Sequence, residues 1–390
     1  MASVLIFEPK TEGHHIVYLR LFYEGLSSCF DRIIVCADFT NDEVVSEIDP
    51  ILRSDVLRLC TGGLDRKQAN TLAFVRSKEA DFLVIPYLDD MLYDLAKYCF
   101  KSRSAGMPKV GGMIMGVKDL RWLRNMIREG HYMAGPKWLV SVVLLRLFFD
   151  SKHVAPTICN QDLAANSIKR ALPKLGTKCS VAHDPWITAP NQPKQTVRES
   201  HSIPADRFVF IHIGSSVRRK GVDHMLIAYE KLLIEHAPGT FMLLRIGDNR
   251  SLSQEVSLLL NKLVDEGKAK VLDRFVDNNE FANLVGCSDC VVLPYRFHTD
   301  SSGVLAAAIG AGVGVIAADY GFIGQAVRKW KCGMLFEHNR LDSLAKVMSD
   351  FYVSGEDYAV PVTQRQSLSP KKFYKCIHEV YRREIQERRC

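Results

Sequence analysis

The chain has 390 residues, of which 47% are hydrophobic and 24% are charged, and its formal net charge is +7. This length predicts two domains, because a single hydrophobic core stops growing at about 250–300 residues, and the composition is typical of a globular protein. The positive charge favours anionic ligands or surfaces, but no zinc-finger spacing, RNA-binding aromatic motif or Gly/Arg tract supports nucleic acid as the partner. No run of eighteen apolar residues is present to span a membrane.

The first half of the chain alternates short apolar runs with helical stretches. The run at 3–7 meets Glu8 at once, which indicates a first buried strand and not a signal peptide. Continuous apolar runs between helices predict a parallel sheet covered on both faces. The expected strands are 3–7, 32–37, 55–59, 81–86, 110–116, 153–159 and 179–183, and the expected helices are about 15–27, 41–48, 65–79, 90–101, 118–129 and 137–150.

A polar segment with prolines at 188–199 interrupts this alternation and is interpreted as the interdomain linker. A second α/β series follows, so the sequence predicts two tandem doubly wound, Rossmann-like domains over 1–190 and 191–365. The tail from 370 to 390 has apolar residues at helical spacing and is expected to bury one stripe. The second series has expected strands at 208–213, 241–246, 271–275, 290–294 and 313–317, with helices at 223–236, 252–266 and 279–286 and a small-residue helix after 303.

The stretch from 292 to 319 reads as a strand, a polar loop, a helix of small residues and a second strand. Ser301 or Ser302 can cap the helix, and the first amides beyond the cap have no partner within it. A helix that begins at the carboxyl end of a strand is a common phosphate-binding site. Tight packing of an ordinary α/β unit is the alternative. The candidate ligand contacts in this stretch are Asp300, Ser301, Ser302, Gly303 and Val304.

Three further segments follow expected strands. Gly214 and Ser215 open a loop that ends in Arg219, Lys220 and Gly221, whose cations suit a diphosphate, with a solvated basic loop as the alternative. Gly247 and Asp248 form a turn after the next strand, where a ligand contact is the minority reading. Near the start of the chain, Gly13 permits close backbone approach, and His15 is a candidate ligand contact or a packing residue.

The eleven cysteines are scattered through apolar patterns, which suits free thiols in a reducing compartment. The single C-x-x-C, Cys287 to Cys290, has no second pair at zinc spacing, so core packing is favoured over metal or redox chemistry.

These elements in this order resemble the GT-B-fold retaining glycosyltransferases of family 4, also called group 1, with good agreement over roughly 205–340. The family's G-x-x-x-x-x-K-G matches Gly214 to Gly221, its V-G-D turn matches 246–248, and its aspartate-strand-proline segment matches 288–295. The signature E-x-F-G-L-x-x-x-E-A-M-A-x-G-x-P-V aligns with 300–315, and here the chain departs from the family. Its departures are Asp300 for the first glutamate, Ser302-Gly303 for Phe-Gly, Ala307 or Ala308 for the ribose-binding glutamate, and Gly314 for the usual proline.

The resemblance implies two domains that face each other across a cleft, with the 366–390 segment crossing back to the first domain near residue 365. It also implies transfer of a sugar from a nucleotide diphosphate sugar to an acceptor hydroxyl, with retention and without a metal ion or a permanent cofactor. Arg219 and Lys220 would stabilise the leaving diphosphate, and Lys220 is expected near the helix start at 302. His15 would act on the acceptor side, where Asp89, Asp90 and His131 are further polar candidates.

The acceptor is expected to be a glycan, a lipid-linked saccharide or a small molecule, and the protein is expected in the cytoplasm. Segment 118–149 combines spaced basic residues with an apolar run, which suits the inner face of an anionic membrane. A basic surface helix followed by a buried helix is the favoured alternative. Two other functions stay open, which are a non-catalytic subunit that supports a partner glycosyltransferase and a GT-B-like epimerase or phosphorylase.

Overall fold

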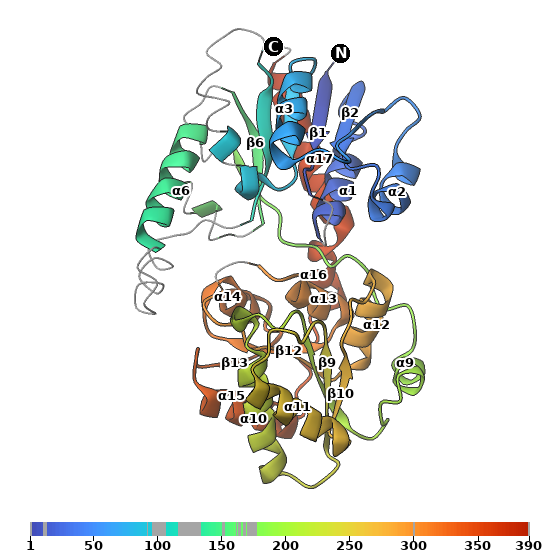
Figure 1. The fold of residues 1–390 in the computed structure, drawn as a ribbon, viewed down its shortest axis with the longest axis vertical. Helices are drawn as coiled ribbons and strands as arrows, with labels where there is room; N and C mark the ends of the chain where they lie inside the picture. The colour runs from blue at the N-terminus through green and yellow to red at the C-terminus, as the bar shows by residue number, and fades with distance from the viewer. Residues whose placement is uncertain are drawn as a thin grey trace. The chain divides into compact units, whose positions relative to one another are not determined.

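The structure is a computed structural model, and it divides into two compact α/β units (Figure 1). The first unit comprises Met1–His183 with Pro370–Cys390, and the second comprises Asp184–Ser369. The chain thus re-enters the first unit at residue 370, against an expected crossover near 365. The structure describes residues 2–10, 14–91, 93–95, 107–115, 134–149, 153–160, 162, 165, 166, 169, 178–298 and 301–388.

The first unit is built on a seven-stranded parallel sheet with the order β3-β2-β1-β4-β5-β6-β7. This order confirms the doubly wound arrangement, because β1 is an interior strand and the chain winds outward from it in both directions. The strands are β1 Ser3–Phe7, β2 Arg32–Ala37, β3 Leu57–Cys60, β4 Phe82–Ile85, β5 Lys109–Ile114, β6 Val154–Cys159 and β7 Cys179–Val181.

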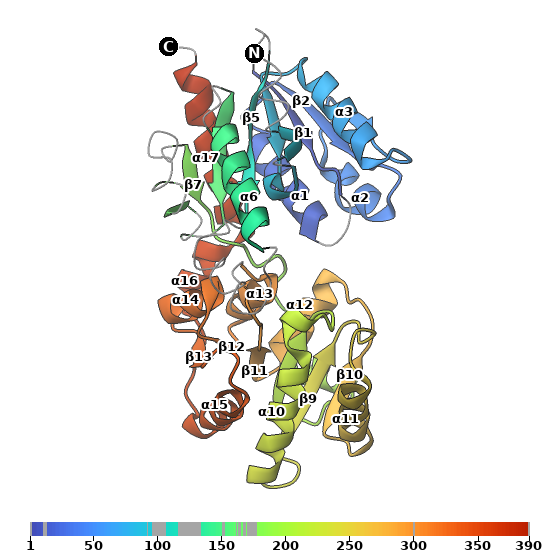
Figure 2. The same cartoon turned by 60° about the vertical axis from the view of Figure 1, so that its left-hand side comes forward.

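Helices cover both faces of this sheet, as continuous apolar strands require. On one face Val4 and Ile6 of β1 pack in a core shared with α1 and α17, and on the other Leu5 and Phe7 pack with α3. Figure 2 shows α6 beside the same sheet. The described helices of this unit are α1 His14–Leu26, α2 Asp42–Glu47, α3 Arg66–Ser77, α6 Ala134–Phe149 and α17 Pro370–Glu387, with short 3-10 turns at η1 Asp49–Ile51 and η2 Leu88–Met91.

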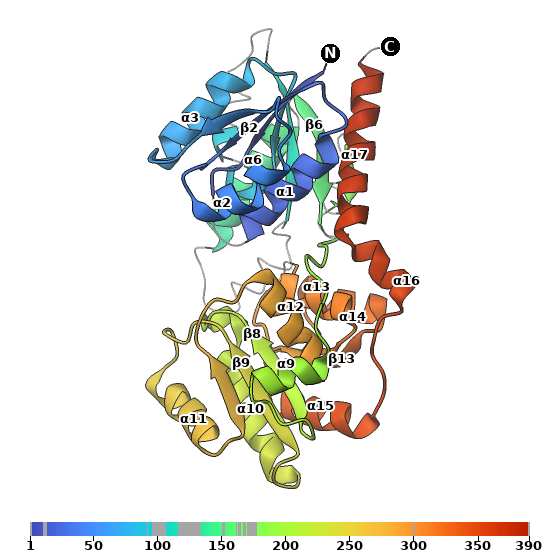
Figure 3. The ribbon, with the colours of Figure 1, turned by 90° about the vertical axis from the view of Figure 1, so that its right-hand side faces the viewer.

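The C-terminal helix α17 is part of the core of the first unit (Figure 3). Phe373, Ile377 and Tyr381 form its buried stripe, which confirms the predicted amphipathic helix. The hydroxyl of Tyr381 donates to the Pro156 oxygen of β6 at 3.0 Å. A Cβ atom on Gly25 would lie 2.8 Å from the Cβ of Ile377, so the glycine allows α1 and α17 to approach closely.

The second unit is built on a six-stranded parallel sheet with the order β10-β9-β8-β11-β12-β13, again doubly wound. Four expected strands are found within one or two residues, whereas the strand expected at 271–275 is Ala269–Leu272. The strands are β8 Phe208–Ile213, β9 Phe241–Ile246, β10 Ala269–Leu272, β11 Cys290–Leu293, β12 Gly314–Ala318 and β13 Gly333–Phe336.

Two apolar cores cover the faces of this second sheet. One includes residues of α9, α12, α13 and α14, and the other includes residues of α10, α11 and α15. Figure 2 shows α10 running beside β9. The helices are α9 Lys194–Ser200, α10 Val222–Glu235, α11 Gln254–Asp265, α12 Asn278–Cys287, α13 Gly303–Ala311, α14 Gly321–Trp330, α15 Leu341–Ser354 and α16 Val362–Arg365, with 3-10 turns at η3 Arg218–Lys220 and η4 Gln366–Leu368.

The linker predicted at 188–199 is wrong for its second half, because α9 belongs to the second unit. Its Val197 is 1% exposed, and the guanidinium of Arg198 is buried. Arg198 donates to the Asp289 carboxylate at 2.7 Å and to the Cys287 oxygen at 2.9 Å. A polar composition predicted solvent exposure, but a buried ion pair with further carbonyl acceptors holds this segment in place.

Candidate functional site

The loop after β8 presents the predicted basic residues of the second unit. Gly214 follows the strand with φ 136°, a conformation that glycine adopts without strain. The turn Arg218–Lys220 comes next, and Gly221 starts α10 with φ 66°. A Cβ atom on Gly221 would lie 2.0 Å from the Pro294 oxygen, so glycine is required where the loop meets the end of β11.

Lys220 is held at both its backbone and its ammonium group. Its Nζ donates to the Tyr295 hydroxyl at 2.9 Å and lies 4.0 Å from the centroid of that ring. Its carbonyl oxygen lies 3.2 Å from Nε2 of the buried His212. Burial and the charge of Arg245 lower the pKa of His212 to about 3, so the ring is neutral and Nε2 is the donor.

A second chain of contacts connects the basic loop to the start of α13. Nη1 of Arg219 donates to Nδ1 of His298 at 3.4 Å, and Nε2 of His298 donates to the Ser301 oxygen at 2.9 Å. Burial lowers the pKa of His298 to about 4, and the charges of Lys220 and Arg219 act in the same direction. A neutral ring that accepts at one nitrogen and donates at the other satisfies both contacts.

The start of α13 is capped as the sequence predicts. Ser302 is the N-cap residue, and its hydroxyl accepts from the Leu305 amide at 3.4 Å. The first bond within the helix runs from the Ala306 amide to the Ser302 oxygen, so the helix does not use the Gly303 and Val304 amides. A Cβ atom on Gly303 would meet no heavy atom of the described residues within 4 Å.

The turn after β9 packs directly against the basic loop. Gly247 has φ 111°, and a Cβ atom there would lie 2.5 Å from the Gly214 oxygen. The Ser216 amide donates to the Asp248 oxygen at 2.8 Å. The Asp248 carboxylate is paired with Arg250 at 2.8 Å, and this bond lowers the pKa of Asp248 to about 2.

In the first unit, the structure places His15 beside the end of β1. Its Nδ1 lies 3.1 Å from Oε1 of Glu8, and its ring centroid lies 4.6 Å from that of Tyr87. Both His15 and Glu8 are buried. A carboxylate that contacts one ring nitrogen fixes the orientation of an imidazole, and it also favours the tautomer in which that nitrogen carries the proton.

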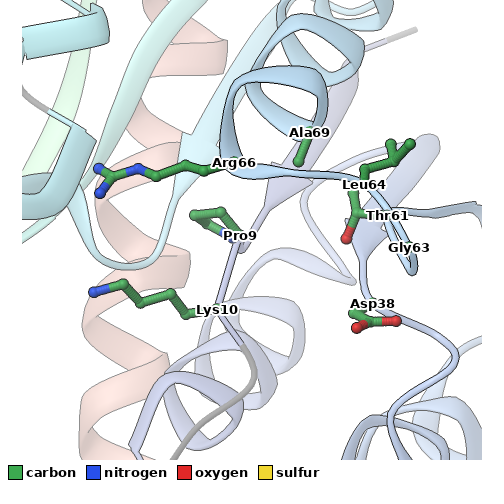
Figure 4. Close-up of a pocket in the computed structure, with 8 residues that line it drawn as sticks. All are labelled: Pro9, Lys10, Asp38, Thr61, Gly63, Leu64, Arg66 and Ala69. Atoms are coloured by element: carbon green, nitrogen blue, oxygen red, sulfur yellow. The ribbon is translucent and has the colours of Figure 1, made fainter.

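A pocket of about 200 Å³ lies at the carboxyl ends of β1, β2 and β3 (Figure 4). Lys10 and Arg66 extend to the same side of it, whereas Asp38 and Thr61 lie on the other side. The carboxylate of Asp38 accepts from the Thr40 amide at 3.0 Å and from the Thr40 hydroxyl at 2.5 Å. The pocket therefore has a basic side, and an opposite side with a carboxylate and a hydroxyl group.

Several predicted residues lie outside the described part of the chain. These are Gly13, Asp300 and His131, together with the basic segment 118–129, and the side chains of Asp89 and Asp90 are likewise not described. The helix at 137–150 is expected to be buried, but α6 exposes several apolar side chains. In α6 the apolar side chains described as 45–56% exposed are Leu139, Val140, Val143 and Leu147.

The described residues contain no group of three or more His, Cys, Asp or Glu side chains placed to hold a metal ion. Cys287 and Cys290 are both buried and free, and burial raises the pKa of Cys287 to about 11. The favoured core-packing interpretation of the C-x-x-C is therefore confirmed. Within the described helices none is long and apolar enough to cross a bilayer.

Sequence reasoning assigned no role to Tyr295, His298 or Glu8, which make the contacts described above. Tyr295 follows Pro294 at the end of a predicted strand, and Glu8 follows the first strand. Polar or aromatic residues at these positions belong to the sheet edge where α/β folds bind ligands, so strand position was an available signal. No sequence signal connects His298 to Arg219, which is 79 positions earlier.

Known proteins of similar sequence and fold agree with this architecture. Residues 193–364 match the family model described as glycosyl transferases group 1. Sucrose-phosphate synthase from Thermosynechococcus elongatus is 14% identical, with a TM-score of 0.70 over 99% of this chain and 100% of that one. Anabaena HepE in complex with UDP is 16% identical, with a TM-score of 0.70 over 97% and 99%.

A glycosyltransferase from Rickettsia africae is 13% identical, with a TM-score of 0.67 over 98% of each chain. A search of curated proteins found no match. At these identities the structural likeness establishes the fold, and the family model identifies the domain that contains the basic loop and α13. The chain therefore has the GT-B fold, and its residues 193–364 match the glycosyl transferases group 1 family.

Proposed function

We propose that this protein is a retaining, metal-independent glycosyltransferase that moves a sugar from a nucleoside diphosphate sugar to an acceptor hydroxyl. The observation that carries the proposal is that Arg219 and Lys220 have no acidic partner among the described residues. Their side chains contact the neutral groups of His298 and Tyr295, and neither cation forms an ion pair with a carboxylate among the described residues. Two cations without an acidic partner, beside a helix start, favour an anionic ligand.

In the proposed reaction, the diphosphate leaves with the electron pair of the bond to the sugar. Lys220 and Arg219 stabilise its growing negative charge, together with the Gly303 and Val304 amides and the capping residues Ser301 and Ser302. Gly214, Ser215, Gly247, Asp248 and Asp300 are the other proposed donor contacts. HepE, one of the structural neighbours, is known in complexes with UDP and with UDP-glucose, which supports a donor of this class.

The proposed acceptor side lies in the first unit. His15, oriented by Glu8, is the residue proposed to act near the acceptor hydroxyl, and the pocket beside Lys10 and Arg66 is the candidate acceptor site. The acceptor is a glycan, a lipid-linked saccharide or a small molecule, and the leaving diphosphate can itself take the acceptor proton. We also propose that the protein is cytoplasmic. In a variant of this proposal, segment 118–149 contacts the inner face of a membrane.

The test begins with calorimetric titration of the full chain with UDP, ADP, GDP, CDP and TDP in the presence of EDTA. One of these is expected to bind, and the matching sugar donors are then assayed for hydrolysis and for transfer to candidate acceptors. NMR spectroscopy of the product anomer distinguishes retention from inversion. A wild-type protein that binds no nucleoside diphosphate would refute the proposal, and binding without turnover would favour the non-catalytic subunit.

A further inference from the structure

Arg245 is a fully buried arginine on β9 whose guanidinium forms no ion pair among the described residues. Its side chain is 1% exposed, and its Nη1 donates to the Ile246 oxygen while Nη2 donates to the Asp248 oxygen at 3.2 Å. Its buried Nε has no acceptor. Among the residues that the structure describes, no carboxylate lies within ion-pair distance of this guanidinium.

Arg198 provides a comparison within the same unit. It is buried to a similar degree, yet it binds the Asp289 carboxylate at 2.7 Å in addition to carbonyl oxygens at 2.9–3.1 Å. Burying a guanidinium is costly unless its charge is paired and its protons are all bonded. At Arg198 the charge is paired and each of the three guanidinium nitrogens donates, whereas among the described residues Arg245 forms no ion pair and its Nε has no acceptor.

Arg245 lies beside His212 and beneath the loops that contain Gly214 and Gly247. It is the register partner of His212 on β8, which is neutral and offers no negative charge. A Cβ atom on Gly247 would lie 3.4 Å from Nη1 of Arg245 and 2.5 Å from the Gly214 oxygen. A Cβ atom on Gly214 would in turn lie 3.5 Å from Cε of Lys220. Arg245 therefore lies directly under the junction of the two loops that form the proposed donor site.

Arg245 retains its charge in this environment. Burial lowers the pKa of Arg245 to about 10, against the opposing effect of the Asp273 and Asp248 charges, which form no ion pair with it, and this pKa is still far above neutral pH. Because a charge in a protein interior acts over several ångströms with little screening, this guanidinium adds to the positive potential of the loops above it.

We propose that Arg245 is a specificity-determining, positioning residue whose unpaired charge is neutralised by the two phosphoryl groups of a nucleotide bound at the Gly214 and Gly247 loops. This inference rests on the proposed donor site. Arg245 holds the Gly247–Asp248 turn through its carbonyl contacts, and its charge makes a diphosphate preferable to a monophosphate. It acts through the loops and does not touch the ligand.

The experiment compares Arg245→Met, which removes the charge at similar volume, with the matched control Arg198→Met. Each full-length variant is titrated with pyrophosphate, UDP and UMP, and its unfolding in urea is followed without ligand. In Arg245→Met we expect pyrophosphate and UDP to bind at least 10-fold more weakly and the preference for UDP over UMP to shrink by a similar factor. Its stability without ligand is expected to be unchanged or higher, since an uncompensated buried charge is lost.

Arg198→Met is expected to behave in the opposite way, with a lower urea midpoint and an unchanged preference for UDP over UMP. If Arg245→Met binds pyrophosphate and UDP as the wild type does, the inference is overturned while the proposed donor site stands. A loss of stability in Arg245→Met as large as in Arg198→Met would also overturn it, because the charge would then be compensated within the protein. A wild type that binds neither pyrophosphate nor UDP refutes the inference together with the donor site on which it rests.

Discussion

Replacing Lys220 by methionine tests the proposed donor site most directly. The substitution keeps the length of the side chain and removes an ammonium group whose contacts among the described residues are the hydroxyl and ring of Tyr295. Two unit charges 4 Å apart interact by about 4 kcal/mol at an effective dielectric constant of about 20. If the leaving diphosphate approaches Nζ to this distance, Lys220→Met is expected to lower kcat/KM about 10³-fold. Folding should be little affected, because no ion pair is broken.

The assay is transfer or hydrolysis of the sugar donor identified by the nucleotide panel, with urea unfolding measured in parallel. Lys231→Met is the matched control, because Lys231 lies on α10 and pairs at the surface with Asp342. Lys231→Met should leave activity unchanged and should lower the free energy of unfolding by no more than about 1 kcal/mol, the contribution of a surface ion pair. Activity of Lys220→Met within threefold of wild type would show that the reasoning about Nζ is wrong.

Three further predictions concern the scaffold around the site. Gly221→Ala should cost about 2 kcal/mol or more in unfolding free energy and disrupt nucleotide binding, since φ is 66° and a Cβ atom would lie 2.0 Å from the Pro294 oxygen. His212 has a pKa lowered to about 3, so the unfolded chain binds more protons below pH 6.5 and stability falls as pH drops from there towards 3. The loss at pH 5 is about 2 kcal/mol. Ile377→Ala in α17 should cost about 2–5 kcal/mol, because this residue is fully buried against α1.

Urea unfolding followed by circular dichroism measures all three effects. Gly239→Ala is the control for Gly221→Ala, since Gly239 also has positive φ but a Cβ atom there meets nothing within 4 Å. An equal cost for both variants would mean that the contact with Pro294 is unimportant. His212→Gln should flatten the pH dependence, and an unchanged slope would contradict the role of His212. Ile377→Ala as stable as wild type would place α17 outside the core of the first unit.

The elements of both sheets were largely predictable from the sequence. Buried parallel strands read as continuous apolar runs, and the helices between them repeat at 3.6 residues, so most bounds fall within a few residues of those expected. The segment 319–369 is an exception, because no elements were assigned there and the structure has α14, β13 and α15. The polar helix α9 is another, since its place depends on an ion pair with Asp289, a residue 91 positions from Arg198.

The sequence by itself determined the two α/β units, the basic loop with Lys220, a serine cap at 301 or 302 and the amphipathic tail, because each depends on neighbouring residues. Only the tertiary structure decided which groups surround the basic loop, because the contacts of Lys220 with Tyr295 and of Arg219 with His298 join positions 75 and 79 residues apart. It also decided that Arg245 is buried without an ion pair among the described residues. A single arginine within an apolar run does not reveal its partners, since these come from neighbouring strands and loops that only the folded sheet brings together.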